Sequence, residues 1–100
     1  MELKNDITLE DFVEQVADDM SQHMEAKDKD YIRSHKLDVF QQHFVLGLYA
    51  RNNYIYPFFN RPDVLYTSLR ALQPDDISTM IVDKLIEKLR GTKKRTQRLP

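Results

Sequence analysis

The sequence predicts a small all-α protein, a bundle of about four helices with a disordered basic tail at its C-terminal end. Apolar residues recur at steps of three and four along residues 9–24 and 77–89, which is the spacing of one helix face. Two glycines and four prolines leave little room for β-hairpin turns. One hundred residues correspond to one domain with a modest core. We therefore expect a single helical domain at 1–91 and a flexible tail at 92–100.

The first helix is predicted to start after Thr8 and to end near Glu25. Thr8 can cap the helix, and Asp11 three residues later lies near the positive end of the helix dipole. The inward face is Leu9, Phe12, Val13, Val16, Ala17, Met20 and Met24. The following stretch AKDKD, residues 26–30, is predicted to be a polar connector.

The second helix starts around Tyr31 or Leu37 and runs to about Asn52. Apolar residues lie on most of its sides, as is typical of the central helix of a domain. One side is formed by Leu37, Phe40, Phe44, Leu48 and Arg51. Gly47 inside this helix costs about 1 kcal/mol relative to alanine. We therefore expect Gly47 to allow the close approach of a neighbouring helix.

Asn52 or Asn53 is predicted to end this helix, because asparagine tolerates the left-handed conformation. Pro57 then biases Tyr56 toward an extended conformation. A short third helix is predicted after the N-cap Asn60. It would turn Val64, Leu65, Leu69 and Leu72 inward.

Asp75 or Asp76 is predicted to cap the last helix. The inward stripe of this helix is Ile77, Ile81, Leu85 and Leu89. Gly91 suits the left-handed position that ends a helix. Residues 92–100, TKKRTQRLP, lack apolar periodicity and are expected to be disordered.

The composition limits which kinds of chemical site the protein can contain. Without cysteine there is no disulfide or thiolate metal site, and the layout of a secretory signal is lacking, so a cytoplasmic location is expected. No apolar run of eighteen residues predicts a membrane span. His23, His35 and His43 are too scattered for a metal-binding pair, and two isolated glycines cannot form a phosphate loop. We expect no metal, no cofactor and no enzymatic activity.

The charges are unevenly distributed along the chain. Residues 1–30 carry ten acidic and three basic side chains, whereas residues 88–100 carry six basic and no acidic ones. This asymmetry favours oriented binding. Asp11, Glu14 and Asp18 on the first helix are predicted to face a basic partner. The basic tail suggests binding to nucleic acid as an alternative, but an overall acidic chain without a basic patch elsewhere argues against it.

The stretch YIYPFF, residues 54–59, carries more aromatic side chains than one loop normally hides. Exposed apolar patches mark interfaces. We therefore predict that Tyr54, Tyr56, Phe58 and Phe59 belong to a surface for a partner or for self-association.

Arg51 lies within the most apolar part of the sequence, four residues after Gly47. A covered guanidinium needs a partner. The two aspartates at the start of the last helix, Asp75 and Asp76, can accept both arms of an arginine and are favoured there by the helix dipole. We therefore predict a structural clamp in which Arg51, with space cleared by Gly47, holds Asp75 or Asp76.

The chain resembles an uncharacterised family of small bacterial proteins, a domain of unknown function. The family pattern is His-Phe-x-Leu-Gly-x-x-x-Arg-Asn-x-Tyr followed by Asp-Asp-x-Ser before an amphipathic helix. The matching positions are His43, Phe44, Leu46, Gly47, Arg51, Asn52, Tyr54, Asp75, Asp76 and Ser78. The chain has Ala50 where the family has isoleucine or tryptophan. The resemblance covers roughly residues 40–90 and implies no activity.

Size, acidity and the lack of catalytic motifs favour a non-catalytic bacterial protein-interaction module. Immunity proteins and antitoxins, which neutralise a partner such as a toxin, share these properties. Opposite charge between the acidic helix and a basic partner would speed their encounter. Two alternatives remain open: a nucleic-acid-binding protein that uses the tail, and a small enzyme with a site formed by His43, Arg51 and Asp76.

Overall fold

The computed structural model describes residues 2–34, 39–64 and 68–91, and these residues confirm the all-α prediction. No strand occurs among them. The α-helices are α1 (Leu9–His23), α2 (Ala26–Arg33), α3 (Val39–Ala50), α4 (Tyr56–Phe59) and α5 (Pro74–Arg90). A π-helical turn, Arg51–Ile55, joins α3 to α4, and two 3₁₀ turns, Pro62–Val64 and Ser68–Ala71, precede α5. No helix in these ranges is long and apolar enough to cross a membrane.

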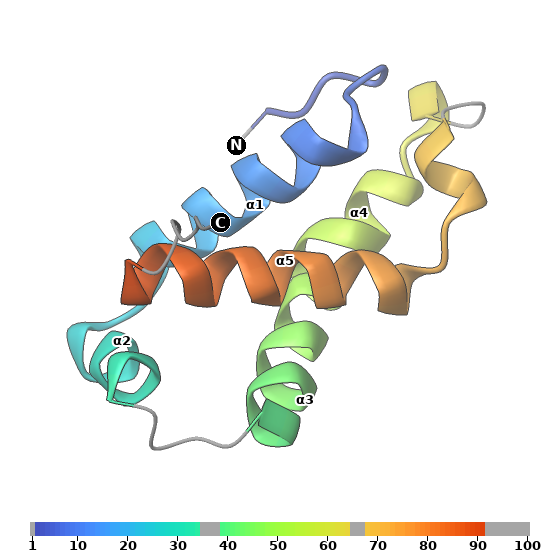
Figure 1. Cartoon of the computed structure of the whole chain (residues 1–100). Coiled ribbons are helices and arrows are strands. Elements are labelled where there is room, and N and C mark those ends of the chain that lie inside the picture. Colours follow the sequence, from blue (N-terminus) through green and yellow to red (C-terminus); the bar gives the residue numbers. More distant parts are fainter. Residues whose placement is uncertain (1, 35–38, 65–67, 92–100) are drawn as a thin grey trace, which may run out of the picture.

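Helix α5 is the element around which the others pack. Figure 1 shows α5 crossing the middle of the molecule, and α1, α2 and α3 each contact it. Its buried residues are Ile77, Ser78, Ile81, Val82, Leu85 and Leu89. These positions cover more than one helix face, because three helices pack against α5 from different directions. The predicted inward stripe of this helix is confirmed.

Helix α1 forms as the sequence predicts. The Thr8 hydroxyl accepts a hydrogen bond from the backbone N–H of Asp11 at 3.1 Å, which satisfies one of the free N–H groups of the first turn. The buried face is Phe12, Val13, Val16, Ala17 and Met20. The ring of Phe12 packs against the ring of Phe58 with 5.1 Å between centroids, which joins α1 to α4.

The predicted polar connector at 26–30 is wrong, because these residues form the first part of α2. Alternating charges gave no apolar stripe to recognise, and one residue, Ile32, supplies the buried contact. The ends of α2 and α5 also hold each other. Arg33 Nε donates to the carbonyl of Leu89 at 3.0 Å, and Arg90 Nε donates to the carbonyl of Ile32 at 2.9 Å. Each arginine thus donates to a carbonyl in the last turn of the other helix.

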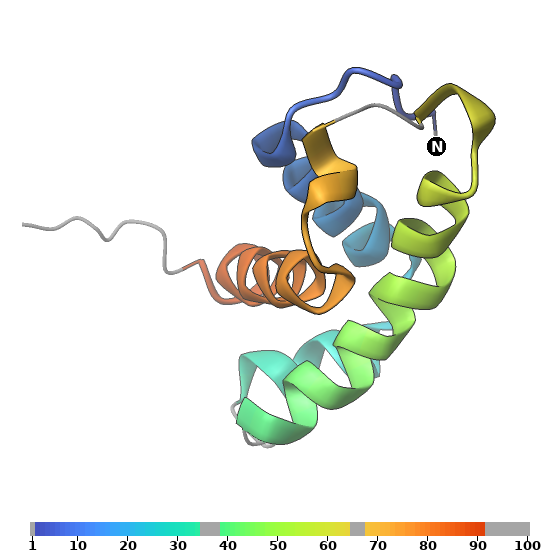
Figure 2. The same cartoon turned by 90° about the vertical axis from the view of Figure 1, so that its right-hand side faces the viewer.

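The predicted helix end at Asn52 or Asn53 is also wrong. Figure 2 shows α3, the π-turn and α4 as one continuous rod. In the π-turn the N–H of Tyr56 bonds to the carbonyl of Arg51, five residues back. Pro57 follows at once and has no N–H of its own. A proline inside a helix collides with the preceding turn, and the wider π-turn relieves this conflict without ending the helix.

The predicted short third helix is replaced by the two 3₁₀ turns, and residues 65–67 between them lie outside the described ranges. The cap of α5 also differs: Gln73 is the N-cap, and Asp75 and Asp76 lie in the first turn. Gly91 ends α5 with a φ of 65°, which confirms the left-handed prediction. The predicted disordered tail, residues 92–100, lies outside the described residues.

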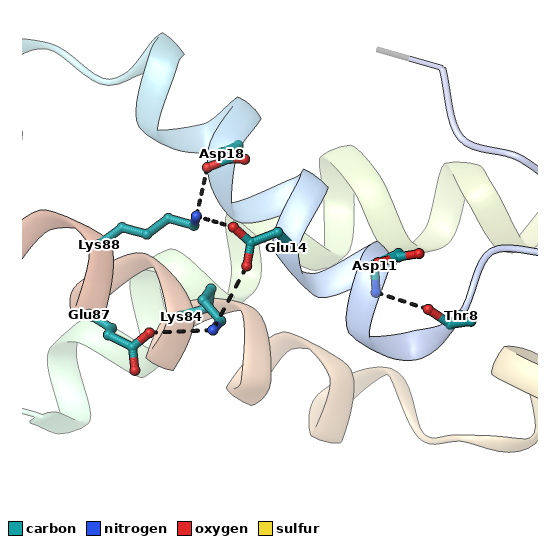
Figure 3. Close-up of polar contacts among 7 residues, drawn as sticks. All are labelled: Thr8, Asp11, Glu14, Asp18, Lys84, Glu87 and Lys88. Carbon is teal, nitrogen blue, oxygen red and sulfur yellow. Dashed lines mark hydrogen bonds and ion pairs between the residues drawn. The ribbon is translucent and has the colours of Figure 1, made fainter. Parts of the chain in front are cut away.

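The acidic residues of α1 and the basic residues near the end of α5 form ion pairs with each other within the fold. Figure 3 shows Lys84 and Lys88 of α5 pointing toward α1. Lys88 Nζ contacts Glu14 and lies 2.8 Å from Asp18 Oδ1, and Lys84 Nζ lies 3.8 Å from Glu14. Burial by itself lowers the pKa of Lys88, but the hydrogen bonds to Asp18 and Glu14 outweigh it and leave the pKa raised.

We predict that Lys88→Met lowers the free energy of unfolding at neutral pH by about 1 kcal/mol at most, because the three side chains are partly exposed. The raised pKa makes the contribution of Lys88 complete below its unfolded pKa, and it disappears as pH rises through the folded pKa. Urea unfolding of both proteins should therefore show a difference at pH 7 that shrinks in strong alkali and in high salt. A difference that grows with pH would contradict this role.

Candidate functional site

Arg51 lies where the rod crosses the start of α5. Its Nη1 donates to the Ser78 hydroxyl at 2.9 Å and lies 3.4 Å from Asp75 Oδ1. Ser78 in turn donates to the Asp75 carbonyl at 2.9 Å. The Arg51 side chain is 19% exposed and that of Asp75 is 84% exposed. Arg51 therefore reaches Asp75, as the sequence predicts, but its buried partner is Ser78.

Gly47 makes room for this contact. A Cβ atom at Gly47 would lie 3.3 Å from Arg51 Nη1 and 3.6 Å from Ser78 Oγ. The first distance is tight enough that a side chain would push against Arg51, whereas the second is an ordinary van der Waals contact with the neighbouring helix. The expected close approach of a neighbouring helix at Gly47 is confirmed.

The remaining members of the predicted sites are dispersed. Asp76 is exposed, and the ion pair of Arg51 is with Asp75 instead. His43 Nε2 lies 3.1 Å from Asp83 Oδ1. Asp83 follows Asp75 by eight residues, about 12 Å along a helix. The structure thus gives His43 and Arg51 separate partners, two turns apart on α5, and does not bring them together with Asp76.

The predicted exposure of the aromatic side chains at residues 54–59 is correct for Tyr56 and wrong for Phe58, and their role in a partner surface stays a prediction. Phe58 is buried, Tyr54 and Phe59 are partly buried against the core, and Tyr56 is the exposed one of the four. These side chains belong to a helix that packs on the core, not to a loop, so most of them turn inward. The predicted acidic surface is also changed, because Glu14 and Asp18 pair with lysines of α5 while Asp11 stays exposed.

The exposed apolar side chains lie on α3 instead. Phe44 and Val45 are 60% and 57% exposed, and Leu48 and Tyr49 one turn later are also exposed. Phe44 and Leu48 belong to the side of the helix that the sequence pattern groups with Arg51. Since α3 is apolar on most sides, periodicity could not show which side α5 would cover. The side that α5 covers carries the small residues Gly47 and Ala50.

A groove of about 730 Å³ lies beside this face, between α3 on one side and α2 with the end of α1 on the other. We call it the α2–α3 groove. Its lining is Met20, His23, Met24, Glu25, Lys27, Asp28, Tyr31, Ile32, Val45, Leu46 and Tyr49. Seven of these eleven residues are apolar or aromatic. Both walls rest on α5, which fixes the groove between them.

A second cavity, of about 390 Å³, adjoins the groove and shares His23 and Tyr49 with it. We call it the Asp19 pocket. Its lining is Leu3, Asp19, His23, Tyr49, Asn53, Tyr54, Pro57, Phe58 and Arg61. The Tyr54 hydroxyl donates to Asp19 Oδ2 at 2.6 Å, and His23 Nδ1 lies 3.5 Å from the same oxygen. Asp19 Oδ1 has no partner among the described residues.

The charges of the Asp19 pocket are set by two pairs. Burial, and then the hydrogen bond to Asp19, raises the pKa of Tyr54 above its ordinary value, so this phenol is neutral and donates. Arg61 makes a bidentate contact with Asp63 at 3.0 and 2.6 Å, which lowers the pKa of Asp63. Its Nη1 also donates to the Leu3 carbonyl. Arg61 is therefore occupied, and Asp19 is the carboxylate that faces the pocket.

No family model, no curated protein and no solved structure matches this chain. The resemblance noted for residues 40–90 stays a prediction. Among residues 2–34, 39–64 and 68–91, no group of three or more histidine, aspartate or glutamate side chains is placed to hold a metal ion.

Two contacts of the site were not predicted from the sequence. Ser78 entered the sequence analysis only as a position of the family pattern, although its place one turn after Asp75 could have suggested a polar contact for Arg51. The hydrogen bond between Asp19 and Tyr54 joins residues 35 positions apart, and no local spacing signals it. Tyr54 was instead assigned to an exposed loop.

We predict that Arg51→Ala lowers the free energy of unfolding by about 2 kcal/mol, because a charged hydrogen bond to buried Ser78 is lost. Gly47→Ala should change stability little in the wild type. Alanine gains about 1 kcal/mol of helix propensity over glycine, and this gain is offset by the steric conflict of its Cβ with Arg51. In the Arg51→Ala background the same change should stabilise by about 1 kcal/mol. Urea unfolding of the four proteins measures this coupling. Equal effects of Gly47→Ala in both backgrounds would contradict the contact.

The raised pKa of Tyr54 predicts a loss of stability in alkali. Above pH of about 10 the unfolded chain releases the Tyr54 proton before the folded chain does, so the free energy of unfolding falls as pH rises. Tyr54→Phe should cost about 1 kcal/mol at neutral pH through the lost hydrogen bond. This difference should shrink as pH rises through about 10, which denaturant titrations at several pH values can measure. A constant difference would exclude the linkage.

Proposed function

We propose that this protein is a non-catalytic protein-interaction module that binds its partner through the α2–α3 groove. The observation that supports the proposal is the exposed apolar surface formed by α3 and by Tyr31 of α2. Tyr31, Phe44 and Tyr49 each leave about half of a side chain exposed, which at about 200 Å² per aromatic residue is roughly 300 Å². Tyr31 and Tyr49 line the groove, and Phe44 lies outside its lining on α3. Val45 and Leu48 extend this face. The largest apolar patch of a monomeric protein is typically about 300–600 Å² and is often functional, and this surface falls at the lower end of that range.

The α2–α3 groove has better support as the functional surface than the acidic helix, the predicted enzyme site or the basic tail. An antitoxin or immunity role was predicted from the acidic helix, but Glu14 and Asp18 already have lysine partners in the fold. An enzyme site of His43, Arg51 and Asp76 lacks convergence of these residues. A nucleic-acid function would depend on residues 92–100, which lie outside the described residues. Binding through the groove requires neither an unpaired acidic helix, nor a catalytic site, nor the tail.

A groove between two helices suits an amphipathic helix, whose apolar face fills the space between the walls. The test is a selection from a displayed library of helical peptides of about 14 residues, roughly four turns. We expect the selected peptides to carry apolar residues at helical spacing. In NMR titrations they should shift the amide signals of α2 and α3.

The matched variants are Val45→Glu, in the groove, and Met80→Glu, at an exposed apolar position of α5. Both replace an exposed apolar side chain by the same charge, so both should keep the melting temperature of the wild type. Val45→Glu should abolish binding of the selected peptides, and Met80→Glu should leave it unchanged. If no peptide is selected, or if both variants bind equally well, the groove is not the interaction surface.

A further inference from the structure

We infer that the partner is an amphipathic helix of another chain whose apolar face fills the α2–α3 groove and whose basic side chain enters the Asp19 pocket. This inference rests on the proposed function and specifies the chemistry of the partner. The two cavities share His23 and Tyr49, so one bound segment can occupy both. The groove offers apolar contact, and the pocket beside it offers a charge.

The Asp19 pocket has the groups that bind an organic cation. The Asp19 side chain is 22% exposed, and its contacts with other side chains in the described part of the chain both use Oδ2, which leaves Oδ1 for a ligand. The rings of Tyr49 and Tyr54 lie beside it, tilted by 54° with 6.2 Å between centroids. A lysine or arginine is attracted both by a carboxylate and by aromatic faces within about 6 Å.

The charges around the two cavities agree with a basic partner. Lys27 pairs with Glu25 at 3.6 Å, and Arg61 pairs with Asp63. Asp19 and Asp28 then remain as lining carboxylates without a lysine or arginine partner among the described residues. A basic side chain bound here would meet its opposite charge, whereas an acidic one would be repelled.

A second copy of this chain fits the groove less well. Its own exposed apolar face lies on α3, and Val39–Ala50 contains no lysine or arginine. The histidine of that helix, His43, already contacts Asp83 of α5. Such a copy could fill the apolar groove but would bring no cation to Asp19.

The geometry also sets a spacing for the partner. Val45 lines the groove and Asn53 lines the Asp19 pocket, and they lie eight residues apart on the rod. This separation corresponds to about 12 Å, or two helical turns. A helix that lies along the rod should therefore carry its basic residue about seven or eight positions from its apolar anchor.

The test uses the tightest peptide from the library and its counterpart with citrulline in place of arginine. Citrulline keeps the shape of the side chain and removes the charge. We expect selected peptides to carry arginine or lysine at the stated spacing, and citrulline to weaken binding about tenfold in calorimetry. Asp19→Asn, whose amide oxygen can still accept from Tyr54, should remove this preference. Asp11→Asn, which removes an exposed charge from the same helix, should retain it.

The outcomes separate this inference from the proposed function. If both peptides bind the groove equally well, or if Asp19→Asn retains the preference for arginine, the cation pocket is excluded while the interaction module stands. If no peptide is selected, or if Val45→Glu does not impair binding, both the inferred partner and the proposed function are excluded. A concentration-dependent dimer in sedimentation equilibrium that Val45→Glu dissociates would show that a second copy covers the groove, and would overturn the inferred partner.

Discussion

The close crossing of α3 and α5 is the constraint on which the arrangement depends. Gly47 and Ser78 bring the two helices together, and Arg51 fixes their angle by binding Ser78 from the next turn of the rod. Because α5 covers the small-residue side of α3, the bulky side of α3 is left outward. The exposed apolar face is thus a consequence of how the core is made, and the groove beside α2 follows from it.

The π-turn extends this constraint to the far end of the rod. In a regular α-helix the ring of Pro57 would collide with a backbone carbonyl of the preceding turn. The wider turn avoids that collision, and the rod continues so that Ile55 and Phe58 are both buried. From the same turn Tyr54 reaches Asp19 on α1. Turns of this kind are frequent at functional sites, and here the turn supplies residues of the Asp19 pocket.

The fold class, α1 and α5 could be predicted because one helix face of each carries a clear apolar stripe and because Thr8 and Gly91 mark an end of each helix. Helix α3 could not be oriented from its pattern, since its apolar residues surround it, and the core side is chosen by the fit of Gly47 against Ser78. Asn52 and Pro57 looked like a helix end because local rules ignore the tertiary packing that holds the rod together. Helix α2 was missed because its stability depends on Ile32 and on arginine contacts with α5.

The same distinction explains what could be foreseen of the site. The contact between Arg51 and Asp75 follows from electrostatics that a sequence displays: a cation in an apolar stretch and an acid at a helix start. Charge alone also suggested a free acidic face on α1, yet Lys88 takes Glu14 and Asp18 within the fold. The helices that carry these opposite charges are packed side by side, so the charges pair within the fold. Among the carboxylates that line the two cavities, Asp19 and Asp28 keep no lysine or arginine partner among the described residues. The proposed contact with a basic partner rests on Asp19, because it lies beside Tyr54 and His23 and next to the apolar groove.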